Sequence, residues 1–397
     1  MTNYPTYKLG EICETTSGGT PNRKNDAYYG GHIPWVKSGE LGKGVIYDTE
    51  EKITEQAVKE SSAKIFPKGT LLIALYGATI GKLGFLGVPA ATNQAVCGIF
   101  ANEKIDLQFL SYYLFHKRND LIAQGTGGAQ PNISQTILKN LPVPLPPLPT
   151  QRLIVSRIES LFAELDKGVE HLRTAQQQIK TYRQAVLRDA FEGNLTKEWR
   201  KHNHISDETW EEKSFNSIAE IKSNLVDVTD YKDYPHIAPD NIEKETGKLL
   251  EYHTIAEDGV ISGKHRFFAG QILYSKIRPN LSKVVIVDFD GLCSADMYPI
   301  EAKGNTKFLW YQMLSDRFVD YASNSGSRTV LPKINQKGLS IIPMKICSIE
   351  EQNEVVIQIE SRLSQASASS AYIENALQQA DALRQSILKK AFSGELV

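Results

Sequence analysis

Apolar residues recur every seven positions through a long segment in the middle of the chain. One row of this repeat is Ile158, Leu165, Leu172, Ile179 and Val186, and a neighbouring row three residues further on is Leu161, Gly168, Ala175 and Tyr182. Two such rows are typical of a helix that packs lengthwise against another helix. Thr150 is the expected N-cap after the proline-rich stretch LPVPLPPLP, and Gly193 is a C-terminal stop signal. The pattern predicts a helix of about 42 residues, roughly 60 Å long.

The end of the chain repeats this pattern. Its rows are Ile359, Ala366, Ile373, Ala380 and Ile387, and then Ser369, Ala376 and Leu383. A lone helix of this length would expose its apolar rows to water, and small residues suit a partner with bulky ones. We therefore predict that the two helices pair antiparallel within one chain. The alternatives are that each helix packs on its own globular unit, or that helices pair between subunits. The expected seam consists of Ile158, Leu165, Leu172, Ile179, Val186, Ile359, Ile373, Leu383 and Ile387.

The two helices belong to a longer internal repeat. The phrase RQAVLRDAFEGNL (183–195) returns as RQSILKKAFSGEL (384–396), and a shift of 201 residues aligns Pro131–Leu195 with Pro332–Leu396 without a gap. About twenty of these sixty-five positions are identical. The same shift places FPKGTLLIALYGATIGK (66–82) on FFAGQILYSKIRPNLSK (267–283). The chain is therefore a duplication of one plan, a globular unit followed by a long helix.

The duplication predicts four segments and a fold class. The segments are a first domain at 1–148, a central helix at 149–200, a second domain at 201–347 and a C-terminal helix at 348–397. Each globular unit reads as short strands, turns and a few helices, with glycine- and proline-rich loops between apolar runs. We expect an α+β protein with two pseudo-repeated α/β domains, separated by a pair of long antiparallel coiled-coil helices. Loops of this kind carry recognition more often than packing does.

Composition limits the class of protein. A net charge of −1 in 397 residues argues against a protein that holds nucleic acid by bulk charge alone. It is consistent with a protein that recognises nucleic acid beside a basic partner. The four cysteines lie far apart and form no CxxC pair, which favours a reducing cytoplasm. The segment after Met1 lacks the pattern of a signal peptide. The most apolar run, 71–88, contains Lys82 and four glycines and reads as buried strands joined by a turn.

Candidate catalytic motifs fail at the level of spacing. GATIGKL (77–83) has three residues between its glycines and Leu83 after the lysine, whereas a phosphate-binding loop needs four residues and then Ser or Thr. The chain has no HExxH, no GxSxG and no NPPY-like tetrad. His202 and His204 form an HxH in a polar stretch without further ligand candidates nearby, so we predict no metal site. We therefore expect a protein that binds and recognises a partner, with catalysis carried out elsewhere.

At this point the chain resembles the specificity subunit of type I restriction–modification systems. The resemblance rests on two different globular units alternating with two similar helices, on the helix entry LPPLPTQ, and on the paired endings YRQAVLRDAFEGNLT and LRQSILKKAFSGEL. The phrases GTLLIALYGATIGK, ATNQA and GGAQPNIS are also similar to that family's recognition domains. The resemblance covers essentially the whole chain.

The resemblance implies a function. Each globular unit would be a target recognition domain that reads one half of a split, asymmetric site on double-stranded DNA, and the helix pair would be the ruler between the halves. Two modification subunits would methylate adenine N6 with S-adenosylmethionine, and restriction subunits would add ATP- and Mg-dependent translocation and cleavage. This chain itself would be a cytoplasmic, non-catalytic subunit without a cofactor and without contact with a membrane.

Base-edge recognition favours particular side chains, and these give our candidate DNA-binding residues. Arginine and lysine suit guanine, asparagine and glutamine suit adenine, and serine and threonine suit either. In the first unit the candidates are Ser17, Thr20, Lys37, Ser38, Tyr76, Thr79, Asn93, Gln94, Gln130 and Asn132. In the second unit they are His236, Asn241, Lys276, Arg278, Asn280, Arg328 and Lys333. Lys82 and Lys283 are equivalent in the repeat, which suits phosphate contacts better than different base readouts.

Two other classes of protein remain as alternatives. The first is a helical assembly scaffold without a role on DNA, and the second is a self-sufficient methyltransferase with an unrecognised active site. Methylation confined to one bipartite motif in the presence of a modification partner would argue against the first, and inactivity of the purified chain alone would argue against the second.

Overall fold

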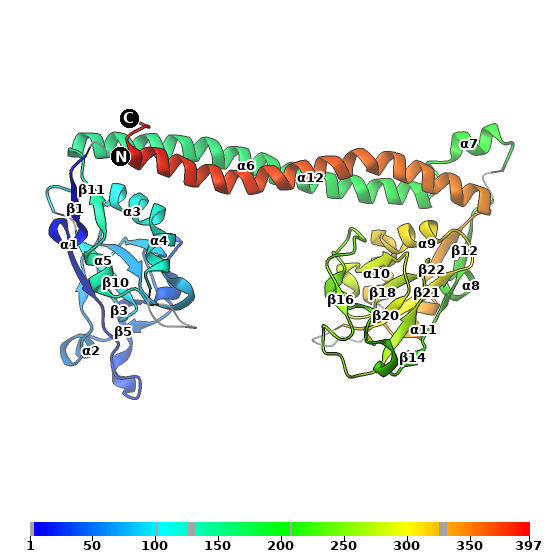
Figure 1. Ribbon diagram of the computed structural model, residues 1–397, viewed down its shortest axis with the longest axis horizontal. Coiled ribbons are helices and arrows are strands. Elements are labelled where there is room, and N and C mark those ends of the chain that lie inside the picture. Colours follow the sequence, from blue (N-terminus) through cyan, green and yellow to red (C-terminus); the bar gives the residue numbers. More distant parts are fainter. Residues whose placement is uncertain (1–3, 101, 126–131, 207–208, 325–331) are drawn as a thin grey trace. The chain divides into compact units, whose positions relative to one another are not determined.

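The computed structural model describes residues 4–100, 102–125, 132–206, 209–324 and 332–397. The chain divides into two compact units, Met1–Leu172 with Asn375–Val397 (unit 1) and Arg173–Glu374 (unit 2). Each unit contains one α/β domain together with part of each of two long helices (Figure 1). The two units differ from the four predicted segments. The predicted segments follow the sequence repeat and give each long helix a segment of its own, whereas each compact unit contains part of both helices.

The domain of unit 1 is built on two larger sheets and one small one. The first sheet pairs, in order, β2 (Glu14–Ser17), β10 (Val96–Phe100), β7 (Leu71–Ala74), β8 (Leu83–Leu86) and β4 (Gly44–Ile46). The second pairs β5 (Lys52–Ile53), β3 (Tyr29–Val36), β9 (Ala90–Thr92) and β6 (Ile65–Phe66), and the small sheet pairs β1 (Thr6–Lys8) with β11 (Pro142–Pro144). The helices of the domain are α1 (Leu9–Ile12), α2 (Glu55–Glu60), α3 (Leu107–His116), α4 (Arg118–Ala123) and α5 (Gln135–Lys139).

Strand β7 shows why the run 71–88 is so apolar. Leu71 and Ile73 lie in a core that includes Phe109 of α3, whereas Leu72 lies in a second core with Phe66. Successive residues of a strand point to opposite faces, so a strand that is covered on both sides is apolar throughout. The predicted pair of buried strands joined by a turn is confirmed as β7, the 3₁₀ turn η3 (Gly77–Thr79) and β8.

The domain of unit 2 has the same plan. Its first sheet pairs β13 (Ala219–Ile221), β21 (Met297–Ala302), β18 (Ile272–Ser275) and β19 (Val284–Ile286). Its second sheet pairs β14 (Leu225–Val226), β17 (Lys264–Phe267), β20 (Gly291–Cys293), β15 (Pro235–Ile237) and β16 (His253–Thr254), and its small sheet pairs β12 (Glu211–Ser214) with β22 (Pro343–Ile346). The helices are α8 (Phe215–Ile218), α9 (Thr306–Met313), α10 (Asp316–Asn324) and α11 (Gln336–Ser340).

The strand orders confirm that the duplication extends through the globular domains. The series β2-β10-β7-β8 corresponds to β13-β21-β18-β19, and β6-β9-β3-β5 corresponds to β17-β20-β15-β16. Single residues agree as well. Gly69 and Gly270 both have φ of +86°, and their N–H groups donate to the carbonyls of Leu86 and Val287 over 2.7 Å. A left-handed backbone of this kind favours glycine, which explains why both copies retain it.

The long helices are α6 (Leu148–Phe191) and α12 (Ile349–Ser393). Each is followed by a glycine with positive φ, +75° at Gly193, as the stop signal there predicts, and +82° at Gly394, its equivalent in the repeat. In unit 1, Arg384 forms an ion pair with Asp166, and in unit 2, Arg183 donates to Ser367 over 2.7 Å. The two helices run antiparallel beside each other in each unit, as predicted (Figure 1). No helix of the described ranges is long and apolar enough to cross a membrane.

Most of the predicted seam is buried, but the second row of α12 is displaced. Ile158, Val186, Ile359, Ile373 and Ile387 are buried, and Leu165, Leu172 and Ile179 are partly buried. Leu383, in contrast, is 50% exposed, so its assignment to the seam was wrong. On α12 a buried position lies four residues after the first row, at Leu363, whereas Ser369 and Leu383 of the predicted second row are exposed.

The end of each long helix packs on the domain of the other repeat. In unit 1, Phe392 of α12 lies edge-on to Phe109 and Tyr113 of α3, with ring centroids 5.4 and 5.0 Å apart. In unit 2, Phe191 of α6 lies edge-on to Phe308 of α9, with centroids 5.3 Å apart. The repeated phrases at 183–195 and 384–396 are therefore two copies of one docking element. The copy at 183–195 docks on the domain of unit 2, and the copy at 384–396 docks on the domain of unit 1.

The beginning of each helix is fixed to its own domain by an equivalent buried glutamine. Gln151 accepts from the N–H of Asp106 over 2.8 Å, and Gln352 accepts from the N–H of Asn305 over 3.0 Å. One alternative was that each long helix packs on the globular domain that precedes it in sequence. This is correct for the beginning of each helix and incorrect for its end.

Candidate nucleic-acid interface

Three chain segments meet beside the end of β7 in unit 1, and we call them the turn cluster of unit 1. They are residues 75–82, 93–95 and 132–134. The N–H of Leu75 donates to the carbonyl of Ala95 over 2.8 Å, and the N–H of Ile133 donates to the carbonyl of Leu75 over 2.9 Å. Tyr76 and Asn132 then form an isolated β-bridge. Main-chain bonds therefore fix these segments whatever their side chains are.

Unit 2 contains the equivalent turn cluster, made of residues 276–283, 294–296 and 333–335. The N–H of Lys276 donates to the carbonyl of Asp296 over 3.0 Å, and the N–H of Ile334 donates to the carbonyl of Lys276 over 2.9 Å. Ile277 and Lys333 form the isolated bridge. The same scaffold thus presents two different sets of side chains, which is what two readers of different sequences require.

The turn cluster of unit 1 presents mainly neutral polar groups. Gln94 and Asn132 are exposed, Tyr76 is 38% exposed, and the hydroxyl of Thr79 donates to the carbonyl of Tyr76 over 2.9 Å. The N–H of Asn93 donates to the carbonyl of Val36 over 3.0 Å, which brings this residue next to Lys37 and Ser38 at the end of β3. The structure therefore brings Tyr76, Thr79, Asn93, Gln94 and Asn132 together, as a shared reading surface requires.

The other candidates of unit 1 lie near this cluster and differ in exposure and in whether their polar groups already have partners. Ser17 accepts from Gln135 over 2.6 Å, and Thr20 and Ser38 are partly exposed. Lys37 lies 3.0 Å from Glu51 and 3.1 Å from Glu50, and the hydrogen bond to Glu51, followed by that to Glu50, raises the pKa of Lys37. The ammonium of Lys37 is therefore already engaged by carboxylates.

Lys82 and Lys283, the predicted phosphate ligands, follow the equivalent turns η3 and η7 (Pro279–Leu281) in the two units. Lys82 is partly exposed. Lys283 donates to the carbonyl of Pro239 over 2.7 Å, lies 3.5 Å from a carboxylate oxygen of Asp240, and has a side chain that is 16% exposed. Their backbone positions are equivalent, but the ammonium group of Lys283 is held against its own domain.

The turn cluster of unit 2 carries cations. The ammonium of Lys333 lies 3.2 Å from Asp296, and that of Lys276 lies 3.8 Å from the same carboxylate and donates to the carbonyl of Ala295 over 2.5 Å. Arg278 and Asn280 are exposed. The structure thus brings Lys276 and Lys333 together around one acidic side chain, and it places Arg278 and Asn280 on the adjoining turn.

Two candidates of unit 2 have internal partners. His236 is buried and its Nδ1 lies 2.7 Å from a carboxylate oxygen of Asp258, a hydrogen bond that lowers the pKa of Asp258. Asn241 accepts from the N–H of Ala238 over 2.8 Å and donates to the carbonyl of Glu251 over 2.7 Å. In the repeat, His236 is equivalent to the buried Trp35, so the fold uses this position for packing in both copies.

The predicted residues Gln130 and Arg328 lie outside the described residues. No finding tests which of the candidates contact bases, so the whole set remains a prediction.

Sequence reasoning missed two residues that support the turn clusters. Asp296 holds the two lysines of unit 2, and Arg118 of α4 donates to the carbonyl of Ile80 over 3.0 Å and so supports the turn of unit 1. The repeat could have pointed to Asp296, because it directly follows the residues equivalent to Asn93 and Gln94. The contact of Arg118 depends on the packing of α4 and left no signal in the sequence.

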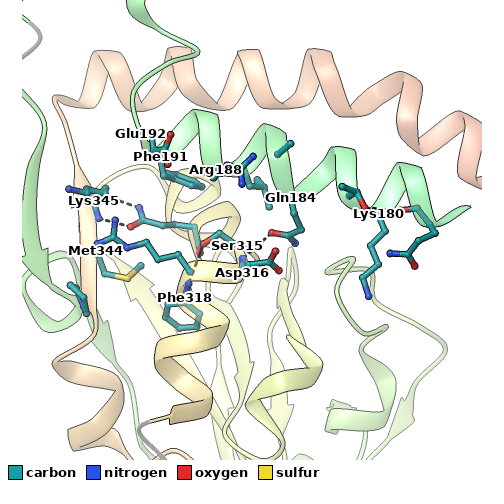
Figure 2. A pocket seen from close by; sticks show the side chains of 17 residues that line it. Lys180, Gln184, Arg188, Phe191, Glu192, Ser315, Asp316, Phe318, Met344 and Lys345 are labelled. Atoms are coloured by element: carbon teal, nitrogen blue, oxygen red, sulfur yellow. Dashed lines mark hydrogen bonds between the residues drawn. The ribbon is translucent and has the colours of Figure 1, made fainter. Parts of the chain in front are cut away.

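A pocket of about 390 Å³ lies under α6 in unit 2 (Figure 2). Gln184 bridges its rim, since it accepts from the N–H of Asp316 over 2.9 Å and donates to the carbonyl of Leu314 over 3.1 Å. Gln312 exchanges two hydrogen bonds with the backbone of Lys345 in its wall, shown as dashed lines. These bonds join helix, domain and β22, so the pocket belongs to the helix–domain seam. The described residues contain no group of three or more His, Cys, Asp or Glu side chains placed to hold a metal ion.

Comparison with known proteins gives consistent matches. The family model described as "Type I restriction modification DNA specificity domain" matches residues 1–172 and 207–379. The EcoDI type I restriction enzyme specificity subunit of Escherichia coli is 42% identical over 313 residues, which are 74% of this chain and 70% of that protein. The EcoKI specificity subunit of Escherichia coli K12 is 23% identical over 92% of this chain and 82% of its own length.

Solved structures share the fold. A chain from a structure on the complex assembly and conformational transition of the type I R-M system matches with a TM-score of 0.73 at 18% identity, over 99% of this chain and 98% of its own. The HsdS subunit from Thermoanaerobacter tengcongensis matches with a TM-score of 0.52 at 17% identity, over 99% and 97% of the two chains.

Proposed function

Because this chain belongs to the type I restriction modification DNA specificity family, we propose that its two domains are target recognition domains that read the two halves of one bipartite, asymmetric DNA site. The observation that carries this proposal is the pair of turn clusters. Their main-chain hydrogen bonds are equivalent, whereas their exposed side chains are mainly neutral amides and hydroxyls in unit 1 and include several cations in unit 2. Equivalent scaffolds with different base-reading groups suit two different half-sites.

The chain acts as a non-catalytic subunit in this proposal. Two modification subunits bind it and methylate adenine N6, and restriction subunits add translocation and cleavage, so that S-adenosylmethionine, ATP and Mg²⁺ are assigned to those partners. A near-neutral chain suits this division, because the partners can supply the phosphate contacts that give affinity. Unpaired, buried cysteines suit the cytoplasm, where we place the complex.

We also propose that α6 and α12 set the spacer between the two half-sites. Both helices continue without a break for 44 and 45 residues, and they pair antiparallel in each unit. A helix pair of this length resists bending better than a loop, so it can fix the spacing of two readers.

Methylome sequencing of a host that carries this chain and its modification subunit tests the proposal. We expect adenine methylation confined to one bipartite motif with a fixed spacer, and its loss when this chain is deleted. Methylation without such a motif would favour the assembly-scaffold alternative. Methyl transfer by the purified chain alone would favour the self-sufficient methyltransferase.

A further inference from the structure

We propose that Arg278 is a specificity-determining residue that reads a guanine in the half-site of unit 2. The inference rests on the proposed function and deepens it, because it names the base class that this domain selects. Three features of Arg278 carry it: its backbone conformation, the freedom of its guanidinium group and its neighbours.

Arg278 occupies a position that favours glycine. Its φ and ψ are 49° and 60°, in the left-handed region, and Ser282 at the other end of the same turn has φ of 45°. The equivalent residues of unit 1 are Gly77 and Gly81, with φ of 63° and 71°. An L side chain in this conformation is strained, and such strain concentrates at functional sites. The turn is thus the same in both domains, but unit 2 carries an arginine where glycine would be less strained.

The guanidinium group of Arg278 is free within the described residues. Four other arginines of the described domains have partners: Arg23 pairs with Glu51, Arg118 donates to Ile80, Arg317 pairs with Glu212 and Arg266 lies over the ring of Phe268. Arg278 is exposed and makes no side-chain hydrogen bond or ion pair with any described residue. An exposed arginine on a fixed backbone is available for a ligand.

The backbone around Arg278 is held from both sides. Its N–H donates to the carbonyl of Pro332 over 2.9 Å, and its carbonyl accepts from the N–H of Leu281 over 2.9 Å. The next residue, Pro279, is buried and has a restricted φ. The Cα of Arg278 is therefore fixed, which lowers the entropy lost when its side chain binds.

The neighbours of Arg278 favour guanine. Guanine presents two acceptors, O6 and N7, to the major groove, and the planar fork of arginine donors matches them. Lys276, Arg278 and Lys333 stand where unit 1 has Leu75, Gly77 and Asn132, so this turn cluster carries three cations that unit 1 lacks at these positions, together with one carboxylate, Asp296. Unit 1 instead carries amides at Gln94 and Asn132, which suit adenine.

The test compares the wild-type complex with Arg278→Gly, the residue that unit 1 has at this place. Glycine removes the strain, so this variant is expected to fold at least as well as the wild type. The complex is reconstituted with its modification subunits, and binding is measured on a duplex with the methylome-defined site and on a random duplex of the same length. We expect about a 5- to 150-fold loss on the site, which corresponds to about 1–3 kcal/mol, and little loss on the random duplex.

A modified base identifies the contact. Replacing each guanine of the site in turn with 7-deazaguanine removes the N7 acceptor, and at one guanine this should weaken the wild type but not Arg278→Gly. Lys222→Gln, which removes a cation that is paired with Glu220 at 2.7 Å, is the control for net charge and should behave as the wild type.

The inference is overturned if Arg278→Gly binds the site as well as the wild type, if it loses equally on both duplexes, or if every 7-deazaguanine substitution affects both proteins alike. These outcomes leave the proposed function intact as long as the wild-type complex prefers its bipartite site. A wild-type complex without any preference would instead contradict the proposed function itself.

Discussion

Arg200 and Glu351 form a buried ion pair in unit 2, with Nη1 and Oε1 2.5 Å apart and side chains that are 4% and 1% exposed. Thr196 and Trp210 donate to the same carboxylate oxygen over 2.6 and 2.8 Å, and Arg200 also donates to the carbonyl of Gly193 over 2.9 Å. These bonds join the end of α6, the short helix α7 (Lys197–His202) and the beginning of α12. The ion pair therefore fastens the connection between the two repeats.

Removing one partner of this pair should destabilise unit 2 strongly. Arg200→Met leaves the carboxylate of Glu351 buried without its counter-charge, and we expect the free energy of unfolding to fall by about 3–5 kcal/mol. Urea unfolding, followed by tryptophan fluorescence, measures the change. The double variant Arg200→Met with Glu351→Gln should recover a large part of the loss, because an amide needs no counter-charge. A single variant within about 1 kcal/mol of the wild type would contradict this role.

The displaced row of the helix seam gives a second prediction. Ile387 is 8% exposed and Leu383, one turn earlier on the same helix, is 50% exposed. We expect Ile387→Gln to destabilise unit 1 by about 2–4 kcal/mol, because it buries an amide and loses apolar contacts. Leu383→Gln should stay within about 0.5 kcal/mol of the wild type, as a surface substitution does. Thermal unfolding of the two variants decides between the observed row and the predicted one, since the predicted row requires both to be damaging.

The seam also shows which parts of the fold a sequence can predict. Self-comparison finds the duplication, and the heptad pattern finds both helices and their antiparallel pairing, because these depend on local periodicity and on burying an apolar stripe. The choice between Leu383 and its neighbours depends on how the two surfaces interlock. The docking of Phe392 on the domain of the first repeat depends on contacts that are far apart in sequence, and no local pattern encodes them.

The sequence also predicted only part of the candidate interface: it gave candidate residues but not the partners of their side chains. Base-reading chemistry alone selected Tyr76, Asn93 and Asn132 as candidates, and the fold brings these residues to one turn cluster. The engagement of Lys37 by Glu50 and Glu51, and the burial of His236 against Asp258, depend on strand pairing and side-chain partners that composition does not show. The strain at Arg278 could have been suspected from its alignment with Gly77, but only a backbone angle reveals it.

The docking of α12 on α3 should depend on pH. The ring of His116 stacks on Phe392 with centroids 5.8 Å apart, and its Nδ1 is buried without a hydrogen-bond partner among the described residues. Burial lowers the pKa of His116 below its ordinary value of 6.5, so the unfolded chain takes up a proton at a higher pH than the folded chain does. Stability is then complete above the unfolded pKa and falls as the pH drops through it.

The measurement is the urea midpoint of unfolding at about pH 7.5 and at about pH 5.5. We expect the wild type to lose stability between these values, and His116→Leu to lose less. His171→Leu is the control, since His171 is exposed on α6, and it should retain the pH dependence of the wild type. An equal dependence in His116→Leu would show that other groups cause it.

The amides of unit 1 should act on one half of the DNA site. Gln94 and Asn132 are exposed in the turn cluster of unit 1, and an amide side chain can bind the N6 and N7 atoms of adenine at the same time. We expect Gln94→Ala and Asn132→Ala each to weaken binding of the reconstituted complex to its site by about 1–3 kcal/mol. The loss should appear as relaxed preference at adenines of one half-site, while the half read by unit 2 keeps its preference.

Competition binding with duplexes mutated at each position measures both effects. The matched control is Asn140→Ala, on an exposed residue that caps α5. Uniform loss across all positions would show that these amides support the fold or contact the phosphates, and would remove them from the reading surface.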